Sequence, residues 1–172
     1  MNIKVMSRAE AVRFTHRNVA MNNDNTKNHY FIISISNKFD ETPLFAADPD
    51  CKGICYLNFD DVEKGEKNCI SEYDVENLMY FLVKAFKKNP NVENIIVHCQ
   101  AGQSRSAGMA AALLKFYNGD DWEIFNNPRY TPNMTVYRMV LERLMGAIID
   151  EEEINIKEQK NIAIWKAYNE IE

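Results

Sequence analysis

The apolar positions of the chain follow two different periods. Residues 30–35 and 92–98 are runs of β-favouring side chains, which is typical of strands buried on both faces, and residues 54–59 indicate a third strand. Residues 71–88 instead have apolar side chains at helical spacing. These side chains are Val75, Leu78, Met79, Leu82 and Phe86. The stretch therefore predicts a helix that packs this stripe into the core.

Two further helices are predicted from their ends. Ser7 and Glu10 have the spacing of a capping box, so we expect a helix that runs from there toward His16. Residues 106–117 contain one charged side chain, and the following Gly119 is a common helix terminator. The low charge and the several alanines predict a helix that is buried close against a sheet.

The remaining segments predict loops and a helical C-terminal part. Residues 18–28 are polar and rich in Asn, and residues 37–53 contain two prolines and a glycine, so both are expected to be irregular. Thr131 and Pro132 predict the cap and the first residue of another helix. Its expected apolar face consists of Tyr137, Leu141, Leu144, Met145 and Ile148.

The C-terminal part begins with an acidic run at residues 150–153, which indicates the solvent-exposed end of a helix and not a binding site. Apolar side chains follow it and predict docking on the domain or on a partner: Ile162, Ile164, Trp165 and Tyr168. We therefore expect residues 1–150 to form one domain and residues 151–172 a helical appendage. The length of 172 residues suits a single domain of this size.

Strands that alternate with helices predict an α/β fold. We expect a mostly parallel central sheet of about four to five strands, flanked by helices, because strands joined by helical crossovers run parallel. The net charge of −5 disfavours nucleic acid or an anionic membrane as a partner. No apolar run approaches the length of about 18 residues that marks a membrane span.

The four cysteines do not predict a disulfide framework or a metal site. They stand at uneven spacings, and the pair formed by Cys51 and Cys55 lacks a second pair or a nearby His cluster. We expect neither a metal nor another cofactor. The chain also begins without the apolar core of a signal peptide, so we expect a soluble, cytoplasmic protein in a reducing compartment.

One segment has the pattern of a phosphate-binding loop. The run of residues 92–98 ends at His98, Cys99 follows, and Arg105 comes six positions later, with Ser106 opening the alanine-rich helix. A short loop that enters a helix points backbone N–H groups into one concavity, and the helix N-terminus adds partial positive charge. Together these features indicate a cysteine-dependent phosphatase, in which the loop is placed between a strand and a helix.

Each residue type suits a step of phosphoryl transfer. Cys99 would attack as the thiolate, and Arg105 can bind two phosphoryl oxygens at once. Ser106 is placed to hydrogen-bond the sulfur, although a serine here can also be a simple helix-start hydroxyl. His98 either braces the loop or is a buried histidine without a chemical step. The remaining loop positions are expected to surround the phosphate: Gln100, Ala101, Gly102, Gln103 and Ser104.

The departing oxygen needs a general acid, and Asp60 and Asp61 are the candidates. They follow the strand predicted at residues 54–59, and the helix at residues 71–88 separates them from the strand that ends at Cys99. Parallel strands end on the same edge of a sheet, so the carboxylates are expected near Cys99. The spacing leaves open which of the two acts, since Asp60 can serve only as a cap.

These residues resemble the protein tyrosine phosphatase superfamily, in its compact dual-specificity-like branch. The resemblance covers roughly residues 54–145, and its most specific part is the loop at residues 98–106. Pro132 and Asn133 are similar to the helix start that follows the loop in that family. The resemblance implies that Asp61 is the general acid. In this chain the interval from acid to nucleophile is lengthened by an extra loop at residues 63–68.

The loop positions between Cys99 and Arg105 are neutral, which disfavours a highly phosphorylated inositol ring as substrate. We therefore expect a phosphorylated protein or another aryl phosphomonoester, and a protein tyrosine or dual-specificity phosphatase activity. Two alternatives remain open. One is a non-catalytic phosphate-binding adaptor, and the other is a different cysteine-loop enzyme, an arsenate reductase or a sulfurtransferase. Arsenate reduction would need a resolving thiol, from Cys55 or Cys69.

Overall fold

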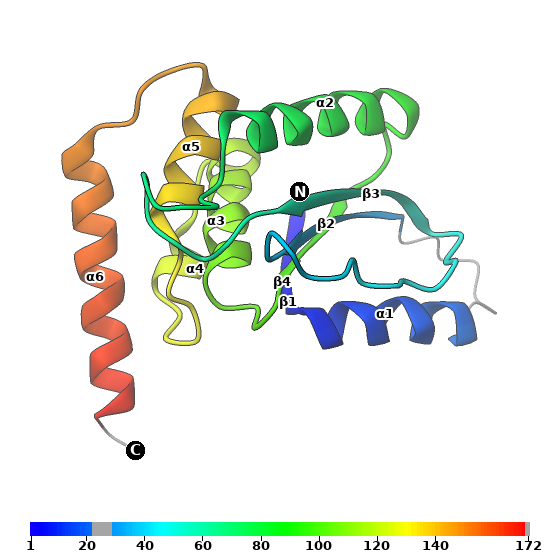
Figure 1. The fold of residues 1–172 in the computed structure, drawn as a ribbon, viewed down its shortest axis with the longest axis horizontal. Helices are drawn as coiled ribbons and strands as arrows, with labels where there is room; N and C mark the ends of the chain where they lie inside the picture. The colour runs from blue at the N-terminus through cyan, green and yellow to red at the C-terminus, as the bar shows by residue number, and fades with distance from the viewer. Residues whose placement is uncertain (22–28, 171–172) are drawn as a thin grey trace.

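The computed structural model of this protein describes residues 1–21 and 29–170. Its centre is a parallel sheet of four strands in the order β1-β4-β2-β3 (Figure 1). The strands are β1 (Asn2–Ser7), β2 (Tyr30–Ser36), β3 (Cys51–Asn58) and β4 (Asn94–Cys99). The prediction of a parallel α/β sheet flanked by helices is therefore confirmed.

Helices cover both faces of this sheet. In Figure 1, α1 (Arg8–Met21) lies below the sheet and α2 (Glu72–Lys88) lies above it. Helix α3 (Arg105–Asn118) packs against β1 and β4, and α5 (Met134–Met145) packs mainly against α3. The short α4 (Trp122–Phe125) and the long α6 (Glu151–Asn169) stand beyond the sheet on the side of α3 and α5.

The central strand β2 shows why its sequence has no polar alternation. Phe31 and Ile33 point into the main core, whereas Tyr30 and Ile32 pack in a smaller cluster with Ala11 of α1. Successive side chains of a strand point to opposite faces, so both faces of β2 are buried. The continuous apolar run of residues 30–35 is thus the expected pattern of a strand between two helical layers.

The helix start predicted from the capping box of Ser7 and Glu10 is confirmed, and the structure shows a second capping box at the start of α2. Ser7 and Glu10 exchange the two capping hydrogen bonds at the start of α1, and Ser71 and Asp74 do so at the start of α2. Two loop predictions were too long. Helix α1 continues through residues 18–21, and the rest of that predicted excursion, residues 22–28, lies outside the described residues. Residues 51–53 already belong to β3.

The predicted start of α5 was wrong by two residues. Asn133, not Thr131, caps this helix, and its Oδ1 accepts a hydrogen bond from Val136 N at 2.9 Å. Pro132 therefore precedes the cap. Thr131 is engaged elsewhere, because its N–H donates to the carbonyl of Gln103 at 3.0 Å. A tertiary contact of this kind is not visible in the local pattern.

The C-terminal helix α6 docks through Ile154, which is buried in the main core, and through polar groups. Lys157 Nζ lies 2.6 Å from Asp121 Oδ1, and the hydroxyl of Tyr137 donates to the same carboxylate at 2.6 Å. Asn161 Nδ2 donates to the carbonyls of Phe125 and Tyr130, at 3.1 Å each. These buried contacts attach α6 to α4 and to the segment that leads into α5.

The apolar residues expected to dock this helix lie largely in solvent. Ile162, Trp165 and Tyr168 are between 42% and 49% exposed, and Ile164 is half-buried. Met145, the last residue of α5, and Ile148, which follows the helix, were also expected on its packed face but are exposed. For Ile148 the reason is Gly146, whose φ of 65° ends α5 before the apolar face continues.

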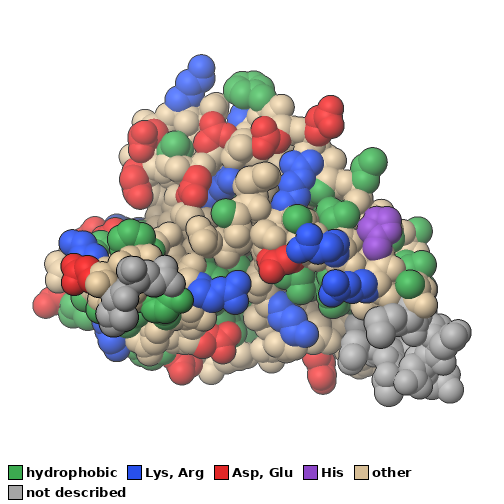
Figure 2. Space-filling view, turned by 90° about the horizontal axis from the view of Figure 1, so that it is seen from below, with side chains coloured by type: hydrophobic (Ala, Val, Ile, Leu, Met, Phe, Trp, Pro, Cys, Tyr) green, Lys and Arg blue, Asp and Glu red, His purple; other side chains and the backbone are tan. Residues whose placement is uncertain are grey.

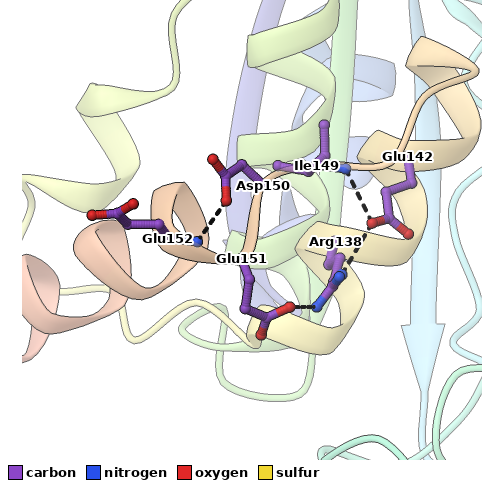
Figure 3. Close-up of polar contacts among 6 residues, drawn as sticks. All are labelled: Arg138, Glu142, Ile149, Asp150, Glu151 and Glu152. Atoms are coloured by element: carbon purple, nitrogen blue, oxygen red, sulfur yellow. Dashed lines mark hydrogen bonds and ion pairs between the residues drawn. The ribbon is translucent and has the colours of Figure 1, made fainter.

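A set of polar contacts joins the end of α5 to the start of α6 (Figure 3). Arg138 donates to Glu142 on its own helix and to Glu151 at the start of α6. Asp150 caps α6 by accepting a hydrogen bond from Glu152 N at 3.0 Å. These contacts are half-exposed or exposed, so they orient the connection more than they stabilise it.

Within residues 1–21 and 29–170, no helix is both long and apolar enough to cross a membrane.

Replacing Lys157 by Met should destabilise the fold, because the Asp121 carboxylate would stay buried without its cation. We expect the free energy of unfolding to fall by about 3 kcal/mol, as when one partner of a buried ion pair is removed. Urea denaturation at neutral pH measures this change. The matched variant Lys166→Met, at an exposed position of α6, should cost less than about 0.5 kcal/mol. A Lys157→Met/Asp121→Asn double variant no more stable than Lys157→Met would contradict the explanation.

Candidate active site

The loop that joins β4 to α3 is fastened on two sides. The N–H of Arg8, at the start of α1, donates to the carbonyl of Gln100 at 3.2 Å. The N–H of Thr131, from the segment before α5, donates to the carbonyl of Gln103 at 3.0 Å. Contacts with α1 and with the segment before α5 therefore help to hold the shape of the loop.

Gly102 makes the closest contact between this loop and the end of β1. Its φ of 74° lies in the left-handed region, which favours glycine. A Cβ at this position would lie 2.6 Å from backbone atoms of Met6 and Ser7. Any other residue would push the loop away from β1, so the glycine is required for the geometry of the whole loop.

Cys99 lies at the base of the loop, and its residue is 2% exposed. Its Sγ is 3.1 Å from the Oγ of Ser106. Burial alone raises the pKa of the Cys99 thiol, but hydrogen bonds from Ser106 and the Gly102 N–H, with the charge of Arg105, outweigh it. The pKa of Cys99 is therefore lowered, which favours the thiolate that a nucleophile requires.

The other three cysteines lack this activation. Burial raises the pKa of each of these thiols, and that of Cys55 reaches about 12. The three are Cys51, Cys55 and Cys69. Cys99 is thus the only one of the four whose surroundings stabilise the anion.

Arg105 places a buried positive charge at the start of α3. Its residue is 4% exposed, and Nη1 donates to the carbonyl of Phe59 at 2.8 Å. Its Nε is also buried and has no hydrogen-bond partner among the described residues. A buried guanidinium at a helix N-terminus opposes the helix dipole, and an unpaired donor adds to the cost. Both costs are offset when an oxyanion binds at this place.

His98 is buried in β4, directly before the nucleophile. Burial lowers the pKa of His98 to about 4, so the imidazole is neutral at neutral pH. Its Nε2 lies 2.8 Å from Ser34 Oγ on β2, and its Nδ1 lies 3.4 Å from the carbonyl of Cys99. This geometry suits a group that braces the loop against the neighbouring strand, and not one that exchanges protons with a substrate.

Asp60 and Asp61 point in different directions. The Asp60 carboxylate accepts hydrogen bonds from Lys38 N at 2.9 Å and from Asn68 Nδ2 at 2.8 Å. These two bonds hold the pKa of Asp60 below its usual value. The carboxylate thus fastens two loops together, and its lowered pKa makes it a poor proton donor.

Asp61 instead turns toward the loop of Cys99. Its Oδ1 accepts hydrogen bonds from the Oγ of Ser104 at 2.8 Å and from the Nδ2 of Asn133 at 3.0 Å. Asn133 N also donates to the carbonyl of Ser104 at 3.2 Å. One carboxylate oxygen is thereby held at the rim of the loop, while the residue itself is exposed to an incoming molecule.

The extra loop at residues 63–68 is fastened to the start of α5. Thr135 Oγ1 donates to Glu63 and accepts a hydrogen bond from Lys64 N at 3.1 Å. At its other end, the side-chain amide of Asn68 donates to the Asp60 carboxylate, and the carbonyl of Asn68 accepts a hydrogen bond from Asp60 N. Asn68 itself adopts a positive φ of 62°. The insertion therefore does not move Asp61 away from the rim.

The rim of the loop is neutral, as its sequence indicates. Gln100, Ala101 and Gln103 are exposed, and Ser104 is half-buried beside Asp61. The structure thus joins the predicted residues through the loop, since Cys99 at its base contacts Ser106 and Asp61 reaches Ser104 at its rim. Asp60 is adjacent but faces elsewhere.

Sequence reasoning missed the residues that position this site. Asn133 was expected only as part of a helix start, yet it also holds Asp61 and Ser104. Ser34 is a polar side chain in an otherwise apolar strand, and such a residue usually has a buried partner, so this signal was present. For Asn68, no local pattern indicated the contact with Asp60.

Ser106→Ala should raise the pKa of Cys99, because the thiolate loses its strongest stabilising hydrogen bond while burial is unchanged. The absorbance of the thiolate near 240 nm, followed against pH, measures this. Subtracting the titration of Cys99→Ser isolates the signal of this one thiol. We expect the wild-type Cys99 thiol to titrate below an ordinary thiol, and that of Ser106→Ala to titrate at a higher pH than the wild type. Equal midpoints would contradict the role of Ser106.

Comparison with known proteins adds similarities of fold. No protein-family model matches the chain. No curated protein matches it either. Among solved structures, human DUSP28 is 13% identical with a TM-score of 0.44, over 99% of this chain and 95% of that chain.

Two further solved structures are similar at the same level. A mouse putative dual specificity phosphatase, in a complex with zinc tungstate, is 13% identical with a TM-score of 0.43, over 97% of this chain and 84% of its own. PTPMT1 is 17% identical with a TM-score of 0.46, over 92% of this chain and 95% of its own. The fold therefore rests on the sheet and helices described above, and the chemistry must be argued from the site itself.

Proposed function

We propose that this protein is a cysteine-dependent phosphomonoester hydrolase, of the protein tyrosine or dual-specificity type. The observation that carries this proposal is the pairing of Cys99 and Arg105 on one loop. The thiol has a lowered pKa, and the buried guanidinium presents an unpaired Nε. A nucleophile beside an oxyanion site is what transfer of a phosphoryl group through the enzyme requires.

In the first step, the Cys99 thiolate attacks phosphorus in line with the leaving oxygen. The new S–P bond forms as the P–O bond to the leaving group breaks, and Asp61 gives its proton to that oxygen. Arg105 and the backbone N–H groups of the loop hold the other phosphoryl oxygens. The product of this step is a cysteinyl-phosphate and the dephosphorylated alcohol or phenol.

In the second step, water hydrolyses the cysteinyl-phosphate. The Asp61 carboxylate takes a proton from the attacking water, and the S–P bond breaks to give inorganic phosphate and the thiolate. The hydroxyl of Ser106, 3.1 Å from the sulfur, eases this departure with a hydrogen bond. The same residue that donates a proton in the first step thus accepts one in the second.

The neutral rim supports a substrate with a single phosphoryl group, on a protein side chain or another aryl or alkyl oxygen. A highly phosphorylated inositol ring would leave several charges without partners at Gln100, Ala101 and Gln103. Arsenate reductase chemistry receives less support. The pKa of Cys55 is raised to about 12 and burial also raises that of Cys69, so neither is prepared to act as a resolving thiolate.

Cys99→Ser should abolish turnover but keep oxyanion binding, because Arg105 and the loop N–H groups are unchanged. Steady-state hydrolysis of 4-nitrophenyl phosphate and of phosphotyrosyl, phosphoseryl and phosphoinositide substrates measures the loss, with vanadate inhibition of the wild type as a control. Turnover of Cys99→Ser above background would refute the proposed nucleophile. Phosphopeptide binding without turnover by the wild type would instead identify an adaptor, and activity only on arsenate or thiosulfate would identify another cysteine-loop enzyme.

Asp61→Asn should lower kcat by about 100- to 10,000-fold, the usual range for loss of a general acid. The defect should grow as the leaving group becomes a poorer one, because a poor leaving group depends more on protonation. Asp60→Asn is the matched control at the adjacent position. It should lower kcat by less than about 10-fold, equally for all leaving groups, since it loosens a loop without removing the proton donor. The reverse pattern would assign the acid to Asp60.

A further inference from the structure

A groove of about 700 Å³ runs along the outer edge of β1, and none of the described residues that line it belongs to the catalytic loop. Residues from both faces of β1 line it, so its floor is the free edge of this edge strand. Helix α1 forms one wall, and the segment from Glu123 to Tyr130 forms the other. An edge strand presents unpaired backbone N–H and C=O groups, which can pair with an extended peptide.

Positive side chains dominate this groove. Four basic residues line it against two carboxylates, although the whole protein has a net charge of −5. The basic residues are Lys4, Arg13, Arg17 and Arg129, and all four are exposed. None of them makes an ion pair within 4 Å with the described part of the chain. They are therefore available to an acidic ligand.

The two carboxylates of the groove, Glu10 and Glu123, offset only part of this charge, because four cations face them. Glu10 caps α1, where it accepts hydrogen bonds from the N–H and hydroxyl of Ser7. These bonds, together with the charges of Arg129 and Arg13, lower its pKa. Arg13 and Arg17 stand one helical turn apart on α1, a spacing at which like charges repel and destabilise a helix. An acidic ligand would relieve this repulsion. Figure 2 views the face of α1 and shows Lys and Arg side chains gathered over it.

One end of the groove meets the rim of the catalytic loop. Met6 lines the groove, and its backbone lies against Gly102 of the loop. On the opposite wall, Tyr130 is followed by Thr131, which donates to the carbonyl of Gln103. A substrate peptide whose phosphorylated residue is bound at the catalytic loop can therefore continue directly into the groove.

We propose that this groove binds an acidic segment that flanks the phosphorylated residue of a protein substrate. The proposal rests on the proposed function and names its substrate class: phosphoproteins with Asp or Glu next to the phosphorylated side chain. The six residues of β1 extend over about 20 Å at the usual rise of a strand, which matches about six residues of extended peptide. The net negative charge of the rest of the protein disfavours a longer polyanion such as nucleic acid.

The test compares phosphotyrosyl peptides that differ only in their flanks. One peptide has three Glu residues on the N-terminal side of the phosphotyrosine, a second has them on the C-terminal side, and a third has Gln at all of these positions. We expect kcat/KM for one acidic peptide to exceed that for the neutral peptide by about 5- to 10-fold at low salt, since exposed charge pairs contribute modestly. The preference should disappear near 1 M salt, where the Debye length is about 3 Å.

Arg13→Gln/Arg17→Gln is the variant that tests the groove. The ratio of kcat/KM between acidic and neutral peptides should fall to less than about 2-fold, and this ratio cancels any general effect on catalysis. The matched control is Lys87→Gln/Lys88→Gln, which removes the same charge from exposed positions at the end of α2. This control should keep the wild-type ratio.

Two outcomes would overturn the proposal: equal kcat/KM for all three peptides, or an unchanged preference in Arg13→Gln/Arg17→Gln. Failure of the proposed function would look different, because no peptide would then be hydrolysed. In that case, fluorescence anisotropy with the same Glu-rich peptide lacking its phosphate still decides. Salt-sensitive binding that is lost in Arg13→Gln/Arg17→Gln and kept in Lys87→Gln/Lys88→Gln would support the groove, and its absence would refute it.

Discussion

A positive charge buried at the start of α3 is the constraint on which the candidate site depends. Arg105 is almost fully buried and keeps one donor unpaired, at a helix end where a cation is unfavourable. The thiolate of Cys99 and an incoming oxyanion both compensate this charge. Against the opposing effect of burial, the pKa of Cys99 is lowered first by the hydrogen bonds from Ser106 and from the Gly102 N–H, and the charge of Arg105 adds to their effect.

The loop keeps this arrangement because distant segments support it. The end of β1 fits against Gly102, the start of α1 binds Gln100, and Thr131 binds Gln103. The C-terminal helix contributes indirectly, since Asn161 holds the carbonyl of Tyr130, the residue before Thr131. The buried contacts of α6 thus hold the segment around Tyr130 and Thr131, which in turn contacts the catalytic loop.

Asp60 and Asp61 are neighbours in the chain, but the first has a structural role and the second lies where a catalytic acid is needed. Asp60 ties two loops together, and its pKa is lowered by the bonds that do so. Asp61 reaches Ser104 at the rim, and Asn133 keeps it there. An insertion between acid and nucleophile is tolerated because Thr135 fastens it to α5. A longer interval in the sequence between Asp61 and Cys99 therefore does not move Asp61 away from the loop.

The sequence by itself determined the features that depend on neighbouring residues. The apolar pattern predicted β2, β3, β4 and the main helices, and the spacing from Cys99 to Arg105 predicted the loop, because both follow from local backbone geometry. The edge strand β1 was not predicted as a strand. Only the tertiary structure decided which aspartate faces the loop and that Asn133 holds it there. It also decided that Lys157 of α6 is buried while Trp165 is exposed, and that the cations of α1 and Arg129 line one groove. These outcomes depend on contacts between residues far apart in the chain, for which neither period nor spacing contains information.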